Sequence, residues 1–225
     1  MGRQIRFPGL GLRISLPAMA AAPPIPKPIP DRVRLPFDFD PDALAADLAA
    51  IADDEWIGHV ARGNFEGRWD IVPLRAAAGE THRLRLIYTD PGAASFVDTP
   101  WLERMPAFRA ALGRLHCELR SVRLMRLAAG STIKEHEDAL DAELGMLRLH
   151  VPVATNPAVD FRLAGRRVVM APGSVWYLRL TEAHSVVNRG ASDRIHLVID
   201  TFLNPWLERM LREGSGGKRE LSPRT

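Results

Sequence analysis

The chain has 225 residues, of which 46% are hydrophobic and 25% are charged, as expected for one globular domain with short tails. The formal net charge is only +3, so we expect no nucleic-acid-binding surface. Cys117 is the only cysteine, which excludes an intrachain disulfide and a cysteine-based zinc site. No apolar run approaches the about 20 residues of a membrane span, and we expect a cytoplasmic protein without a membrane partner.

The two ends of the chain differ in composition from the middle. Residues 1–36 are expected to form a proline-rich arm, because the run PPIPKPIP at 23–30 favours an extended, polyproline-type path. Residues 214–225, GSGGKRELSPRT, are expected to be a disordered tail. A single domain is therefore predicted over residues 37–213.

Two helices are predicted ahead of the core of this domain. In residues 38–51, Asp40 can cap a helix and Pro41 suits its first turn, while apolar residues recur at helical spacing. A second helix is predicted from residue 99 or 100 to residue 115. Its apolar stripe consists of Leu102, Met105, Phe108, Leu112 and Leu115.

From about residue 121 the apolar period changes to two, which is typical of strands. The predicted strands are 122–127, 146–153, 159–163, 167–171, 174–178, 185–188 and 194–202. Turn dipeptides such as Pro172-Gly173 separate them. We predict an α+β, mainly β fold: a double-stranded β-helix, that is, a cupin-like jelly-roll core from about residue 121, with flanking N-terminal helices.

A candidate metal site lies in and after this strand-rich region. His136 and Asp138 are two residues apart, so in an extended segment their side chains point to the same side. His184 stands directly before the predicted strand 185–188. Two histidines and one carboxylate can hold one face of an octahedral metal ion and leave other positions open. The alternative for His136 and Asp138 is a simple turn in which the carboxylate accepts backbone donors.

A candidate anion site accompanies the metal ligands. Arg194 leads the predicted strand 194–202, and a buried guanidinium there needs an anion, such as the distal carboxylate of 2-oxoglutarate. Arg148 and His150 share one face of another predicted strand and complete a polar pocket. His196 is expected to be structural. The histidines at 59, 82 and 116 are expected to be surface or helix residues.

Several segments resemble the aspartyl/asparaginyl β-hydroxylase family, which includes the related bacterial proline cis-4-hydroxylases. Between residue 133 and about residue 206, the matching segments are HED, RLHVPV, APGSVWYL, AHSVVN and DRIHLVIDTF. The segment WDIVPLR at 69–75 is similar more weakly. The resemblance implies an Fe(II)- and 2-oxoglutarate-dependent dioxygenase that consumes O2.

The resemblance also implies roles for individual residues. His136 and His184 would bind iron, Arg194 and His150 would bind 2-oxoglutarate, and Arg148 would contact the substrate. Arg75, which ends the weaker segment, is the best candidate for a second substrate contact. The animal protein aspartyl hydroxylases lack the carboxylate ligand, whereas Asp138 stands in that position here. The chain is therefore more similar to the bacterial branch, with a complete triad.

The expected activity is hydroxylation of an amino-acid side chain, with the β-carbon of Asp or Asn, free or in a peptide, as the first choice. Hydroxylation of proline or another free amino acid is the alternative. Two other classes stay open: a zinc hydrolase, since the same ligands can activate water on zinc, and a non-catalytic, cupin-like binding module. The zinc hydrolase hypothesis leaves Arg194 without a role.

Overall fold

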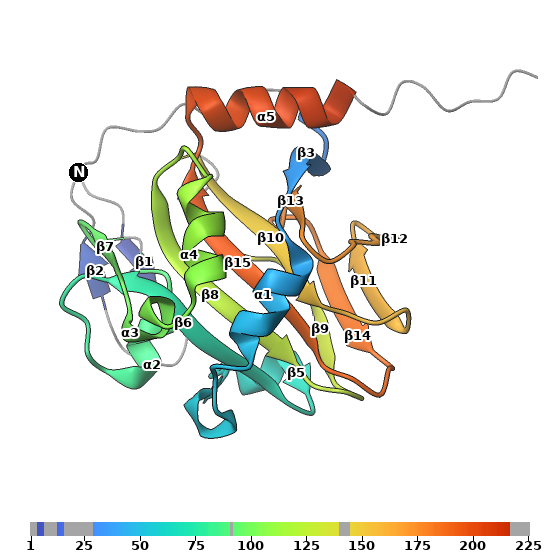
Figure 1. Ribbon diagram of the computed structural model, residues 1–225, viewed down its shortest axis with the longest axis horizontal. Coiled ribbons are helices and arrows are strands. Elements are labelled where there is room, and N and C mark those ends of the chain that lie inside the picture. Colours follow the sequence, from blue (N-terminus) through green and yellow to red (C-terminus); the bar gives the residue numbers. More distant parts are fainter. Residues whose placement is uncertain (1–3, 7–12, 16–28, 91, 140–144, 217–225) are drawn as a thin grey trace, which may run out of the picture.

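Two antiparallel sheets lie face to face in the structure (Figure 1). The structure is a computed structural model and describes residues 4–6, 13–15, 29–90, 92–139 and 145–216. The large sheet has the order β3 (Arg32–Asp38), β13 (Ser174–Leu178), β10 (Met146–Ala154), β15 (Arg194–Phe202), β8 (Leu119–Leu127), β6 (Trp69–Ala77) and β4 (Ile57–Gly58), with β7 (Phe96–Asp98) paired to β6. The small sheet has the order β12 (Arg166–Arg167), β11 (Val159–Leu163), β14 (His184–Asn188), β9 (Thr132–His136) and β5 (Phe65–Glu66). A separate pair joins β1 (Gln4–Arg6) and β2 (Arg13–Ser15).

Strand alternation gives the large sheet two different faces. On β10, Leu147 and Leu149 belong to the apolar cluster under the helices, whereas Arg148 and His150 point toward the small sheet. A second apolar cluster, with Phe161 from the small sheet, fills the space between the sheets. The fold therefore places charged side chains from the large sheet opposite the small sheet, next to an apolar interior.

Helices cover the outer face of the large sheet (Figure 1). They are α1 (Pro41–Leu48), α3 (Pro100–Glu103), α4 (Pro106–Gly113) and α5 (Pro205–Gly216), and the short elements α2 (Arg83–Leu86), η1 (Asp53–Glu55) and η2 (Arg62–Asn64) lie in the connections. The predicted cap is confirmed, because the Asp40 carboxylate accepts hydrogen bonds from the backbone N–H groups of Asp42 and Ala43. Within the described residues, no helix has the length and apolar character needed to cross a membrane.

The prediction of one helix from residue 99 or 100 to residue 115 was wrong. The chain leaves helical geometry at Met105, with φ −122° and ψ 76°, and a second helix starts at Pro106. Proline has no N–H for the helix ladder and disfavours helical geometry in the residue before it. Helix α5 was not predicted. It includes residues 214–216, which were assigned to the tail, and residues 217–225 lie outside the described residues.

The mainly β, jelly-roll class is confirmed, and three strands have the predicted bounds: β11, β13 and β15. The strand predicted at 167–171 was wrong beyond its first residue. The chain turns at Gly173, whose φ is +79° and where a Cβ atom would lie 2.3 Å from the Phe39 carbonyl oxygen. Strands β1 to β7 and β9 were not predicted. Because β3 begins at Arg32 and pairs with β13, the proline-rich arm cannot extend to residue 36; residues 16–28 lie outside the described part.

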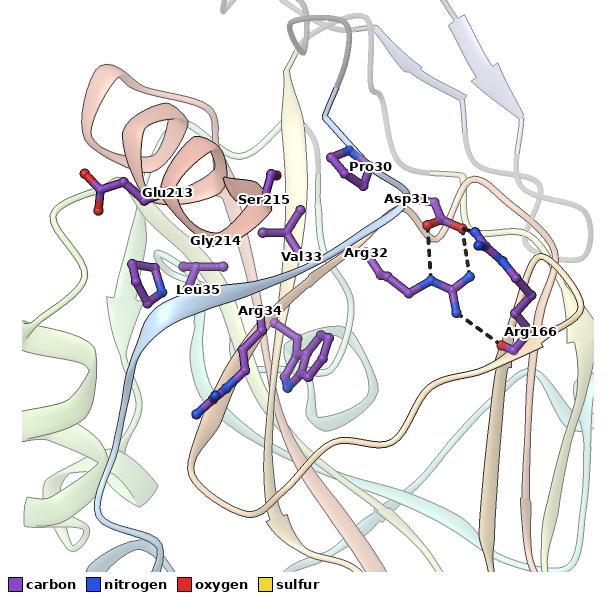
Figure 2. Close-up of a pocket in the computed structure, with 12 residues that line it drawn as sticks. Pro30, Asp31, Arg32, Val33, Arg34, Leu35, Arg166, Glu213, Gly214 and Ser215 are labelled. Carbon is purple, nitrogen blue, oxygen red and sulfur yellow. Dashed lines mark hydrogen bonds and ion pairs between the residues drawn. The ribbon is translucent and has the colours of Figure 1, made fainter. Parts of the chain in front are cut away.

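A hollow of about 700 Å³ lies beside β3, the end of α5 and Trp176 (Figure 2). Two arginines of the hollow share one carboxylate: Nη2 of Arg32 and Nη2 of Arg166 each lie 2.8 Å from the Asp31 carboxylate. The hydrogen bond from Arg32 is the main cause that lowers the pKa of Asp31 to about 2. Arg32 also donates to the Leu163 carbonyl oxygen, so this cluster fastens the edge of the large sheet to the small sheet.

Replacing Leu124 by Ala tests the packing of the helices on the sheet. Leu124 is fully buried in the cluster under the helices, so its truncation is expected to lower the free energy of unfolding by about 2–5 kcal/mol. Leu84→Ala is the control, because Leu84 is 44% exposed, and its cost should stay below about 0.5 kcal/mol. Urea denaturation measures both values. Equal costs would contradict the assigned core.

Candidate metal centre

Three side chains converge at one end of the small sheet. His136 ends β9 and His184 begins β14, and the two residues are direct partners in the strand pairing. Asp138 follows β9, where its backbone N–H donates to the Leu180 carbonyl oxygen at 2.7 Å. Its Oδ1 lies 3.6 Å from Nε2 of His136 and 3.9 Å from Nε2 of His184. A metal ion bound at about 2 Å from each atom can bridge these gaps.

Backbone carbonyl groups fix the orientation of both imidazole rings. Nδ1 of His136 lies 2.8 Å from the Lys134 carbonyl oxygen, and Nδ1 of His184 lies 3.0 Å from that of Glu182. A carbonyl oxygen can only accept, so in the neutral ring the hydrogen is on Nδ1 and the lone pair is on Nε2. This outer hydrogen bond is the usual arrangement behind a metal-binding histidine.

The electrostatics of the cluster favour a bound cation. Burial raises the pKa of Asp138, yet the nearby Arg148 charge and the neighbouring His136 ring outweigh it and hold that pKa well below its usual range. Burial lowers the pKa of His184. The neighbouring Asp138 carboxylate raises the pKa of His136. An ionised carboxylate with two imidazoles is a donor set that fits Fe(II), and it leaves coordination positions open.

Arg194 supplies a buried positive charge in the same cavity. The cavity has a volume of about 200 Å³, and the three candidate ligands, Arg194 and His150 are among its lining residues. The Arg194 side chain contacts Nδ1 of His196 at 2.9 Å, but no carboxylate of a described residue pairs with it. Its Nε has no hydrogen-bond partner there. Burial lowers the pKa of Arg194 to about 9. An anion in the cavity would therefore offset the free-energy cost of burying the charged guanidinium.

His150 adds a second unsatisfied polar atom to this wall. The residue is only 6% exposed, and its Nε2 has no hydrogen-bond partner among the described residues. Burial holds its pKa well below the usual value, so the ring is neutral near pH 7. Its other ring nitrogen, Nδ1, lies 3.4 Å from Nδ1 of His196.

The two arginines expected at a substrate site have different surroundings. Arg148 lines the cavity, but three of its nitrogen atoms already contact Asp138 and Asp200. Arg75 is not among the residues that line the cavity; it pairs with Asp98 and donates to the Phe96 carbonyl oxygen at 2.8 Å. The structure therefore does not bring Arg75 to the candidate metal ligands, because β7 pairs with β6 and supplies partners for both terminal nitrogens of Arg75 outside the cavity.

His59 was expected to be a surface or helix residue. In the structure it is half-buried, follows β4 and lines the cavity. Its ring is stacked on Trp69, with ring centroids 3.8 Å apart and an interplanar angle of 3°. Its Nδ1 accepts a hydrogen bond from the Ala61 backbone N–H at 3.1 Å, so the neutral ring carries its hydrogen on Nε2. This contact depends on the pairing of β4 with β6, which no local sequence pattern indicated.

His59→Gln is expected to reduce the loss of stability between pH 7 and pH 5. Burial lowers the pKa of His59 from 6.5 to about 4, so in this window the unfolded chain binds more protons than the folded chain. Stability contributed by the neutral ring is present above about pH 6.5 and is lost as the pH falls toward 4.

The wild-type protein should lose on the order of 1 kcal/mol more than the variant between these two pH values, as urea denaturation would measure. His82→Gln, at an exposed position, is the control and should match the wild-type protein. An identical loss in the wild-type protein and His59→Gln would show that burial of His59 is not coupled to pH.

The chain is similar to several known proteins. A curated relative, the L-proline cis-4-hydroxylase of Rhizobium meliloti (strain 1021), is 26% identical over 179 residues. The match covers 77% of this chain and 61% of the relative, so the chain spans less than two thirds of that protein's length.

Solved structures with similar chains include two prolyl hydroxylases. One is a prolyl-4-hydroxylase of Pseudomonas putida, with 14% identity, a TM-score of 0.45, and coverage of 77% of this chain and 93% of that chain. The other is the viral collagen prolyl hydroxylase of Paramecium bursaria Chlorella virus-1, with 8% identity, a TM-score of 0.45, and coverage of 77% and 97%. The sequence model described as aspartyl/asparaginyl beta-hydroxylase matches residues 43–204, which is well over half of the chain. The protein belongs to the aspartyl/asparaginyl β-hydroxylase family.

Proposed function

We propose that this protein is an Fe(II)- and 2-oxoglutarate-dependent hydroxylase that acts on an amino-acid side chain. The proposal is carried by two features of one cavity. The first is a cluster of two histidines and one ionised carboxylate, and the second is a buried arginine without a carboxylate partner among the described residues. The first feature suits a metal ion with open positions, and the second suits the far carboxylate of a bound dicarboxylic acid.

Each lining residue has a defined task in this proposal. His136, Asp138 and His184 would hold the iron. The bound iron would activate O2, so that 2-oxoglutarate is oxidised to succinate and CO2 while a C–H bond of the substrate is hydroxylated. Arg194 binds and orients the far carboxylate of 2-oxoglutarate, and the free Nε2 of His150 contributes a polar contact beside it.

The apolar part of the cavity wall excludes water from the reacting groups. It is formed by Met125, Ile133, Phe161, Leu180, Val186 and Val198. Five of these side chains come from the two sheets and Leu180 comes from the turn after β13; all six belong to the apolar cluster between the sheets. The wall also orients Arg194 through a cation–π contact, because the guanidinium carbon of Arg194 lies 5.7 Å from the centre of the Phe161 ring.

The zinc hydrolase is less well supported than the oxygenase. Its metal site would use the same three ligands, but a metal-activated water needs no unpaired arginine in the cavity. Keeping a buried guanidinium without an anion is costly, so a function that brings an anion accounts for more of the structure. A binding module without catalysis would also use the arginine, and the assay below separates it from the oxygenase.

Two substrate classes are supported by the relatives. The family name refers to aspartyl and asparaginyl residues, and the curated relative is named for free L-proline. The cavity has a volume of about 200 Å³, which is the scale of small molecules and single side chains. We therefore propose an amino acid, free or in a peptide, as substrate, with β-hydroxylation of Asp or Asn and hydroxylation of proline as the two reactions to test.

The proposal is tested by loading the protein with Fe(II) without oxygen and then measuring succinate after adding 2-oxoglutarate and O2. The assay is run alone and with L-proline, L-aspartate, L-asparagine or an Asp-containing peptide. Succinate formation, increased by one of these compounds, is the expected result. Asp138→Ala should produce none while keeping its far-ultraviolet circular dichroism spectrum. Metal-loaded protein that forms no succinate under any condition would refute the oxygenase and favour the hydrolase or binding module.

Replacing Arg194 by Met is expected to raise the KM for 2-oxoglutarate at least about 30-fold. Removing one partner of a buried charge pair costs about 2–5 kcal/mol, and this pair forms only with the cosubstrate. The KM for the amino-acid substrate should change much less. Arg189→Met is the control, because the Arg189 side chain is 65% exposed. An unchanged KM for 2-oxoglutarate in Arg194→Met would assign the anchor to another cation.

A further inference from the structure

A fully buried carboxylate, Asp200, lies behind the candidate metal centre. Asp200 on β15 is the direct pairing partner of Arg148 on β10, and its exposure is 0%. Nε of Arg148 lies 2.6 Å from Oδ1 of Asp200, and Nη2 of Arg148 lies 3.1 Å from Oδ2. Arg123 donates to the same Oδ2 at 2.5 Å, and the Thr89 hydroxyl also donates to it. Asp200 thus receives donors from three directions, which fixes its position.

Arg148 connects this carboxylate to the metal ligand. Its remaining terminal nitrogen, Nη1, contacts Oδ2 of Asp138, while Oδ1 of Asp138 is the oxygen that faces the Nε2 atoms of His136 and His184. The two oxygens of Asp138 therefore have separate partners. One is held by Arg148, and the other is available to a metal ion.

The charges of this network balance. Arg123 and Arg148 carry two positive charges, and Asp138 and Asp200 carry two negative charges, all on side chains that are largely shielded from water. Without Asp200, two guanidinium groups would share Asp138 as their carboxylate. Arg148 would then be free to approach both Asp138 oxygens and to compete with a metal ion for them.

We propose that Asp200 is a positioning residue for the metal centre, which acts through Arg148 to hold Asp138 with one oxygen free for the metal. The inference deepens the proposed function, since it rests on the same metal site, but it concerns metal binding and not turnover. The competing explanation is that Asp200 only neutralises Arg123 and Arg148 in the interior. That role would affect stability and leave metal affinity unchanged.

The experiment measures Co²⁺ binding to the full chain by isothermal titration calorimetry and by the visible absorption of the bound ion. Four proteins are compared: wild-type, Asp200→Asn, Arg148→Met, and the double variant. Loss of a group that orients a metal ligand typically costs 10- to 100-fold in affinity, and we expect about this loss for Asp200→Asn. The double variant should bind no more weakly than Arg148→Met, because Asp200 acts through Arg148.

Asp98→Asn is the matched control. It also removes a carboxylate from an ion pair with an arginine, Arg75, but outside the cavity, and its Co²⁺ affinity should equal that of the wild-type protein. The absorption spectrum gives a second readout that a purely structural role would not change. A displaced Asp138 alters the number of ligands around Co²⁺, and therefore the intensity and position of the absorption bands.

Unchanged Co²⁺ affinity in folded Asp200→Asn would overturn the inference, and so would losses that multiply in the double variant. If Asp200→Asn does not fold, Arg148→Met decides, because Asp200 there keeps its partner Arg123. Unchanged affinity in Arg148→Met would then overturn it. Wild-type protein that binds Co²⁺ but forms no succinate with Fe(II) would refute the proposed function alone. Wild-type protein that binds no metal would refute both.

Discussion

The burial of charged side chains between the two sheets is the constraint on which the rest of the site depends. Arg123, Arg148, Arg194 and Asp200 all lie on the inner face of the large sheet, where each charge needs a partner. Three of them satisfy one another and extend to Asp138. Arg194 lacks a carboxylate partner among the described residues, and this difference separates the network beside the candidate metal ligands from the position proposed for an anion.

Much of the site could be predicted because its residues follow strand alternation. His136 and Asp138 are neighbours on one side of an extended segment, and Arg194 begins a strand whose bounds were predicted correctly. The clear period of two and the glycine-containing turns also gave β11 and β13. The helix break at Pro106 was readable from the proline alone, but the continuous apolar stripe from 102 to 115 favoured one helix.

The features that were missed depend on which strands pair and in what register. Arg148 is held by Asp200 because β10 and β15 place these residues opposite each other, and His59 reaches Trp69 because β4 pairs with β6. Neither pairing has a local sequence signal. The same holds for the assignment of Arg148 to substrate: its alternation with His150 put it correctly on the cavity wall, but alternation does not show which partners occupy its donors.

The site is assembled from both sheets, and this has a consequence for how the protein responds to its ligands. The candidate metal ligands are His136 on β9, His184 on β14 and Asp138 just after β9, whereas Arg194 and Arg148 come from β15 and β10. An ion and an anion bound together would form a cross-link at the seam between the two layers. Ligand binding and the free energy of unfolding are then linked, so any ligand that contacts both sheets in the folded state also stabilises the fold.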